Sequence, residues 1–496
     1  MKRADKFANV VIFSAILGVG AVVVYLFYKQ MQGVPTPLYY YSAVLVALFG
    51  LLATLKLSRP HRLNVVIMLI SIFVMVYSME AMLFFYGNPL SYRTPRYLAA
   101  QRSGIEYDSR TPLQVVDQLR REGIDAYPYV APHYFIGAMP AIDDEPIYAL
   151  GGIANVTTVM CNESGEYIIY ESDRYGFPNP DTVWEAPNAD IVTVGDSFTQ
   201  GACVPLEENM VGQIRAAYPQ TLNLGSSGSG PLGMLAALTE YGAAYKPPIV
   251  LWFYFEGNDL GDMLNERENP FLVNYLEGDF TQDLMARQAE VDETRHQYVT
   301  ALIDNLQKSR RGELIASLRL YNIRRLLGLT REPPPEKRQI SSYEELIVEI
   351  GSHESQAVDK FLAFDTVAQT TDSMSDTIID QTAEVDPIFE EGIDYFGDVL
   401  AASQAYVASW DGELIFVYLP DYMRYDAENA VSEEAMYRLE ILPIIDELGV
   451  PMIDIHQTFS AHPNPASLFP FEMQGHYNEE GYALVAEEVL KFLENR

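Results

Sequence analysis

A single serine follows a buried strand, in a position suited to a nucleophile. The apolar run at 191–194 leads directly into the triplet Gly195-Asp196-Ser197, and small and polar residues then open a helix. A strand-to-helix turn exposes a hydroxyl beside backbone N–H groups, which can stabilise the oxyanion of an acyl-transfer intermediate. A Gly-Asp-Ser triplet is also ordinary turn chemistry, so the functional interpretation needs partners elsewhere in the chain.

Three further residues supply those partners, each at the end of a predicted element. Gly225 ends a short strand, Asn258 follows the apolar strand 248–255, and His476 precedes an amphipathic helix. Taken singly, Asn258 could close a turn and His476 could cap a helix. Together they offer donors for an oxyanion and a base for Ser197, because a serine hydroxyl is a poor nucleophile until a base takes its proton.

This ordered series of serine, glycine, asparagine and histidine resembles the SGNH (GDSL-like) hydrolases over residues 188–496. The resemblance implies that Ser197 is the nucleophile and contributes its own N–H to the oxyanion hole. It implies that Gly225 gives a second N–H, that Asn258 gives a side-chain N–H, and that His476 is the general base. No cofactor is expected, and the other six histidines lack the spacing of metal ligands.

The sequence departs from the family pattern immediately before the histidine. The family usually has an aspartate two or three residues earlier, where this chain has Gln474 and Met473. Glu472 is the nearest carboxylate and could take that place, or it could be a surface charge. If it is a surface charge, His476 is oriented by a carbonyl or works with Ser197 as a dyad.

Alternating apolar strands and amphipathic helices predict the fold of residues 188–496. We expect a flavodoxin-like, three-layer α/β/α SGNH hydrolase domain with a five-stranded parallel sheet. An insertion at about 260–388, mainly helical, interrupts the alternation. The predicted strands are 191–195, 221–225, 248–255, 414–420 and 451–455, and the predicted helices are 207–218, 231–244, 389–409, 432–448 and 478–494.

The first 87 residues differ from the rest and predict a membrane anchor of three helices. The runs 8–28, 38–55 and 63–86 are each long and apolar enough to cross a bilayer. Basic residues gather before the first run and between the second and third, which favours a cytoplasmic N-terminus. Residues 88–187 then form a connecting region, and the hydrolase domain lies outside the cytoplasm, as in a protein of the bacterial inner membrane.

Charge and cysteine usage agree with an exported domain. The formal net charge of −35 argues against nucleic acid as a partner and is compatible with a neutral or cationic glycan. Cys161 and Cys203 are the two cysteines of the chain, and an oxidising compartment permits a disulfide between them. Two free, buried thiols are the alternative.

These features predict a membrane-anchored serine esterase that removes O-acetyl groups from a cell-envelope or secreted polysaccharide through an acyl-serine. Two alternatives stay open. The acyl-serine could be transferred to a sugar hydroxyl, with a membrane acyltransferase or polysaccharide-assembly protein as partner. The chain could instead be a non-catalytic glycan-binding or assembly subunit, which the missing aspartate before His476 favours.

Overall fold

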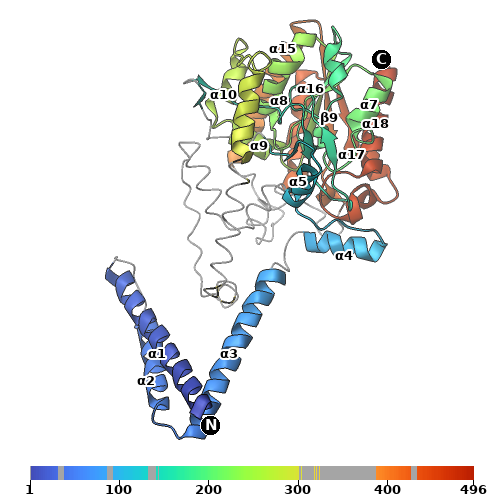
Figure 1. Cartoon of the computed structure of the whole chain (residues 1–496). Coiled ribbons are helices and arrows are strands. Elements are labelled where there is room, and N and C mark those ends of the chain that lie inside the picture. The colour runs from blue at the N-terminus through green and yellow to red at the C-terminus, as the bar shows by residue number, and fades with distance from the viewer. Residues whose placement is uncertain are drawn as a thin grey trace. The chain divides into compact units, whose positions relative to one another are not determined.

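The chain forms two compact units in the computed structural model (Figure 1). One comprises Met1–Pro89 and Glu313–Pro334, and the other Leu90–Gly312 and Pro335–Arg496. Most of the insertion predicted at 260–388 lies outside the described residues. The structure describes residues 2–31, 38–86, 93–131, 141–142, 145–300, 387–425 and 433–496, with Ile303, Leu318, Leu320 and Ile323.

The first unit contains three N-terminal helices. They are α1 (Lys2–Met31), α2 (Leu38–Thr54) and α3 (Arg59–Tyr86). Helix α1 contacts both α2 and α3. The small buried core of this unit consists of Ala8 and Ile12 from α1 and Val66 from α3. Large apolar side chains elsewhere on these helices, such as Phe13, are exposed.

The helices support the prediction of three membrane spans in part. Among the described residues, only Lys6–Phe27 and Arg59–Leu83 are long and apolar enough to cross a membrane, with mean hydropathies of 2.7 and 2.2. Helix α2 has 17 residues, and its described apolar stretch is the shorter Val44–Thr54. The sequence run 38–55 is uncharged throughout, but its helix ends one residue short of that run.

A parallel five-stranded sheet is the centre of the second unit. Its strand order is β7-β6-β8-β9-β10, and every neighbouring pair is parallel. This is the flavodoxin-like order 2-1-3-4-5. The strands are β6 (Ile191–Val194), β7 (Thr221–Asn223), β8 (Ile249–Phe255), β9 (Glu413–Leu419) and β10 (Met452–Asp454).

Alternate side chains of β6, β8 and β9 belong to two separate cores, so the sheet is covered on both faces. Trp252 and Phe416 belong to the core that includes residues of α8, α9, α15 and α16, whereas Phe253 and Val417 pack with α7, α17 and α18 (Figure 1). These helices are α7 (Met210–Ala217), α8 (Pro231–Ala237), α9 (Asp259–Glu266), α15 (Pro387–Ala408), α16 (Glu433–Leu448), α17 (Ile455–Ala461) and α18 (Glu479–Glu494). The prediction of a three-layer α/β fold around a five-stranded parallel sheet is confirmed.

The described residues between 93 and 190, which precede β6, belong to the same compact unit as the sheet. Strand β4 lies between β1 and β5, parallel to the first and antiparallel to the second, and α5 packs on β1 and β4. A separate pair, β2 with β3, is antiparallel. The elements are α4 (Arg93–Ser103), α5 (Pro112–Arg121), β1 (Ala126–Pro128), β2 (Ala141–Ile142), β3 (Glu145–Pro146), β4 (Thr157–Val159) and β5 (Ile169–Glu171).

A disulfide joins this N-terminal part to the sheet, as the sequence predicts. Cys161 follows β4 and is bonded to Cys203, six residues after Ser197, with a Cα–Cα distance of 5.2 Å. Both cysteines lie in a small buried cluster with Tyr129 and Tyr170. The bond therefore fixes the segment after β4 beside the turn that carries Ser197.

We expect loss of the disulfide to lower the free energy of unfolding by about 4 kcal/mol, because the bond closes a loop of 42 residues. The measurement is thermal unfolding of the full-length chain, comparing the wild type with the Cys161→Ser/Cys203→Ser double variant. Reductant should destabilise the wild type and leave the double variant unchanged. Equal unfolding temperatures of wild type and double variant would contradict the prediction.

Candidate active site

Strand β6 delivers Ser197 to the first position of the short helix α6 (Ser197–Gln200). The Asp196 carboxylate caps this helix by accepting a hydrogen bond from the Phe198 N–H at 2.9 Å. Gly195 permits the tight turn, since a Cβ there would lie 2.0 Å from Thr199 Oγ1. The Ser197 side chain is buried, with an exposed fraction of 1%.

His476 meets Ser197 from the opposite end of the chain. Its Nε2 lies 2.8 Å from Ser197 Oγ, within hydrogen-bond reach of the hydroxyl. Asn478 caps the following helix α18 by accepting from the Gly481 N–H, and the neighbouring Tyr477 hydroxyl donates to the Pro420 carbonyl. The chain is therefore fixed directly after His476, which limits the positions open to the imidazole ring.

The carboxylate beside His476 is Glu163, which sequence reasoning did not find. Its Oε1 lies 3.0 Å from His476 Nδ1, and its Oε2 accepts the His476 backbone N–H at 2.9 Å. Burial by itself raises the pKa of Glu163, but the Arg96 guanidinium and the hydrogen bonds from His476 lower it to about 2. Glu163 is therefore ionised at neutral pH and can orient and stabilise an imidazolium.

Glu472 does not occupy this position, which corrects one of the alternatives left open by the sequence. It is exposed, and its carboxylate accepts a hydrogen bond from Asn464 Nδ2 at 2.8 Å. Phe471 and Glu472 both have positive φ, at 58° and 53°, so the chain turns there before it reaches His476. Closeness in sequence therefore gives no contact between Glu472 and the imidazole.

Gly225 has a different local role from the one that the resemblance implies. Its N–H donates to Asn223 Oδ1 at 2.9 Å and is not free for an oxyanion. A Cβ on Gly225 would lie 2.4 Å from the Gln200 N, so glycine allows the loop after β7 to approach α6 closely. In the same loop Gly228 has φ 67°, and its N–H has no acceptor among the described residues.

Asn258 lies at the carboxyl end of β8, as expected, and is the N-cap residue of α9. Its Nδ2 donates to Asp262 Oδ2 at 2.9 Å, which orients the amide and leaves its second N–H available. Asn258 therefore stays a candidate oxyanion donor.

Side-chain amides of Asn179 and Asn223 connect the end of β7 to the helix α6 that begins at Ser197. Asn179 Oδ1 accepts from the Asn223 N–H and its Nδ2 donates to the Asn223 carbonyl, at 2.8 and 2.9 Å. Asn223 Nδ2 then donates to the Thr199 carbonyl at 2.8 Å, inside the turn that follows Ser197. Asp173 accepts from Asn179 Nδ2 and is buried, so it supports the site as a structural residue.

Glu163, His476 and Cys203 place three potential ligand atoms within 4.8 Å of one another. Cys203 Sγ is bonded to Cys161 and therefore offers no thiolate to a metal ion. The other two residues are hydrogen-bonded to each other. Ser197, His476 and Glu163 form one hydrogen-bonded series, which we call the triad, and we interpret the group as part of this series rather than as a metal centre.

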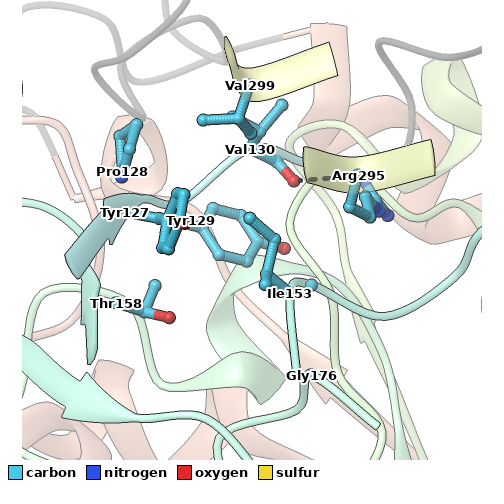
Figure 2. Close-up of a pocket in the computed structure, with 10 residues that line it drawn as sticks. Tyr127, Pro128, Tyr129, Val130, Ile153, Thr158, Gly176, Arg295 and Val299 are labelled. Atoms are coloured by element: carbon cyan, nitrogen blue, oxygen red, sulfur yellow. Dashed lines mark hydrogen bonds between the residues drawn. The ribbon is translucent and has the colours of Figure 1, made fainter. Parts of the chain in front are cut away.

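The pocket in Figure 2 lies between β1 and helical residues 288–300 and contains none of the triad residues. Buried Arg295 closes one side by donating to the Val130 and Ala149 carbonyls, at 3.3 and 2.9 Å. Tyr129 lines the pocket, and its hydroxyl lies 3.1 Å from Ser226 Oγ, in the loop after β7. Tyr129 thus connects the wall of the pocket to the loop after β7.

Comparisons with known proteins give structural similarities only. No model of a protein family matches the sequence, and no curated protein matches it. A crystal structure of a two-domain esterase (CEX) active on acetylated mannans, co-crystallised with mannopentaose, is similar at 12% identity and a TM-score of 0.28; the match covers 64% of this chain. It spans 51% of the esterase, about half of its length.

A second similar structure is LAE5, an α/β hydrolase enzyme from the metagenome of Lake Arreo, Spain. The match has 13% identity and a TM-score of 0.27, and it covers 61% of this chain and 95% of that one. At these values neither similarity carries an argument about activity or substrate.

We expect Glu163→Gln to lower kcat for a model ester by about 10²- to 10⁴-fold, because the imidazole loses the charge that orients and stabilises it. Glu472→Gln is the matched control and should keep wild-type activity, since Glu472 contacts Asn464 instead. Steady-state kinetics of the full-length variants make the comparison. Loss of activity in the Glu472 variant alone would contradict the assignment.

A second prediction concerns two buried carboxyls behind Ser197. Burial raises the pKa of Asp259 well above its usual range, with the charge of nearby Asp196 as a second cause. Burial also raises the pKa of Asp196, to about 6. The folded chain therefore holds more protons than the unfolded chain above pH 4, and its stability should fall as pH rises from about 5 to 8.

Asp259→Asn tests this because asparagine can still accept the hydrogen bond that the Phe255 N–H gives to Asp259. We expect the variant to be more stable than the wild type at pH 8, with a difference that shrinks toward pH 5. Each proton contributes at most about 1.4 kcal/mol per pH unit. Unfolding temperatures across this pH range provide the test, and parallel curves for variant and wild type would contradict it.

Proposed function

We propose that this chain is a membrane-anchored serine esterase of the SGNH type that removes O-acetyl groups from a cell-envelope or secreted polysaccharide. The observation that carries the proposal is the hydrogen-bonded series of Ser197, His476 and Glu163, with contacts of 2.8 and 3.0 Å. A nucleophile, a base and an orienting carboxylate in this order are the arrangement needed for acyl transfer through serine.

The chemistry follows from this series. Ser197 Oγ attacks the ester carbonyl carbon while His476 Nε2 takes the hydroxyl proton, and Glu163 stabilises the imidazolium. His476 then gives the proton to the sugar oxygen as its bond to the acyl carbon breaks. Water next attacks the acyl-serine and loses a proton to His476, which returns it to Ser197 Oγ as acetate leaves.

The oxyanion needs donors close to Ser197, and three groups fit that role in the proposal. They are the Ser197 N–H, one Asn258 side-chain N–H, and a backbone N–H from the loop after β7. Within that loop we favour Gly228 over Gly225, because the Gly225 N–H is already donated to Asn223 Oδ1. Each donor contributes about 10²- to 10³-fold in kcat.

The location of the active site is argued from the N-terminal helices, their flanking charges and the disulfide. Two helices have the length and hydropathy of membrane spans. Basic residues at the start of α1 and around the junction of α2 and α3 favour the cytoplasm there; they are Lys2, Arg3 and Lys6, and Lys56, Arg59 and Arg62. The Cys161–Cys203 bond is typical of an oxidising compartment. We propose an inner-membrane protein with the lipid bilayer and an acylated glycan as its partners and its catalytic unit in the periplasm.

Hydrolysis of p-nitrophenyl acetate by the full-length protein in detergent is the direct test. We expect turnover by the wild type and its loss in both Ser197→Ala and His476→Ala. Acetate release from chemically acetylated oligosaccharides would then support the polysaccharide proposal.

Two outcomes would point to the alternatives. If Ser197 becomes acetylated but turnover appears only with a membrane partner and a sugar acceptor, the reaction is acyl transfer. If the wild type neither turns over the ester nor becomes acetylated, and Ser197→Ala still complements a deletion, the chain is a non-catalytic subunit.

A further inference from the structure

Helix α4 places a buried arginine against the triad. Arg96 has an exposed fraction of 5%, and Arg96 shares the buried face of α4 with Ala100. Its Nη2 lies 3.4 Å from Glu163 Oε1 and donates to the Gln474 carbonyl at 2.7 Å. Arg96 therefore contacts the carboxylate of the triad and also the loop that carries His476.

The residue before His476 leaves space for this contact. A Cβ on Gly475 would lie 2.3 Å from Arg96 Nη2 and 2.6 Å from Glu163 Oε2. Any side chain at Gly475 would thus displace the guanidinium or the carboxylate. The missing Cβ is an independent sign that the loop is built around the pair of Arg96 and Glu163.

The loop that carries Glu163 is held close to α4 as well. The Asp108 N–H donates to the Gly165 carbonyl at 2.7 Å, and Asn162 Nδ2 donates to the Asp108 carbonyl at 2.9 Å. The segment that follows α4 therefore ties the turn at 161–165 to the helix. Together with the Cys161–Cys203 bond, it fixes Glu163 from two directions.

We propose that Arg96 is a positioning residue of the esterase, acting through Glu163, and that α4 is thereby part of the catalytic apparatus. This inference rests on the function proposed above. Helix α4 follows the apolar helix α3 closely in the chain, because α3 ends at Tyr86 and α4 begins at Arg93. The helix that follows the last N-terminal apolar helix in the chain supplies a residue on which the base depends.

Arg96 can act in this way because the buried pair of Glu163 and His476 carries a net charge. Glu163 and a neutral His476 together carry one negative charge, and Arg96 balances it. Without Arg96 the pair would bind a proton more tightly, and His476 would be an imidazolium, unable to act as a base, over a wider pH range. Within the part of the chain that the structure describes, Asp196 interacts with His476 and Tyr482 with Glu163, and neither of these groups supplies a positive charge.

The test compares Arg96→Gln, Arg96→Lys and the matched control Arg102→Gln in the full-length protein. Arg102 lies on the same helix but is exposed. For p-nitrophenyl acetate we expect Arg96→Gln to lower kcat about 10- to 100-fold, with little change in KM. The acidic limb of its pH profile should move up by about one unit. Arg96→Lys should restore part of both effects, and Arg102→Gln should behave as the wild type.

A purely structural role for Arg96 predicts a different result. Activity would then fall equally at every pH, together with the unfolding temperature, and the acidic limb would stay in place. That outcome, or an Arg96→Gln profile that superimposes on the wild type, overturns the inference.

A measurement that needs no turnover distinguishes failure of the proposed esterase function from failure of the inference about Arg96. If the wild type neither hydrolyses the ester nor reacts at Ser197 with a fluorophosphonate, the esterase proposal fails. The imidazole pKa of His476, measured by ¹⁵N-histidine NMR, still tests the inference. A higher pKa in Arg96→Gln than in the wild type supports it, and an unchanged pKa overturns it.

Discussion

Two hydrogen bonds between Glu163 and His476 join positions 313 residues apart, and the rest of the site depends on them. One fixes the imidazole ring and the other fixes the backbone of the same residue, so the ring and its loop are oriented together. Once this contact exists, its surroundings are constrained: Gly475 must lack a side chain, and the turn after Cys161 must be held in place. The sheet places Ser197, and in the proposed mechanism this long-range contact is what makes the serine reactive.

The parts of the site that the sequence predicts are those governed by local patterns. Strand β6 and helix α18 follow from hydrophobic periodicity, and the predicted bounds 191–195 and 478–494 differ from the structure by one residue. Ser197 and His476 lie directly beside these elements, so their meeting at one edge of a parallel sheet could be expected. The disulfide was predictable because the chain has two cysteines and an exported topology was inferred.

The parts that the sequence does not predict depend on contacts between distant segments. Glu163 lies in a turn without periodicity, and its one local signal is Cys161, two residues earlier. Glu472 is near His476 in sequence, yet two residues with positive φ direct it away. Gly225 matches the position that the resemblance implies, but its N–H donates to Asn223 Oδ1, which only the geometry of the loop reveals.

A buried carboxylate beside a general base must satisfy two opposing requirements. It should stabilise the imidazolium that forms as Ser197 loses its proton, yet it should not hold a proton on the imidazole before substrate arrives. An unbalanced Glu163 would favour the imidazolium in both states, because water is excluded from the pair. Arg96 offsets the resting charge while both Glu163 hydrogen bonds to His476 remain. In this proposal Glu163 stabilises the imidazolium most while the proton is being transferred. The rate depends on this difference in stabilisation between the resting state and the transition state.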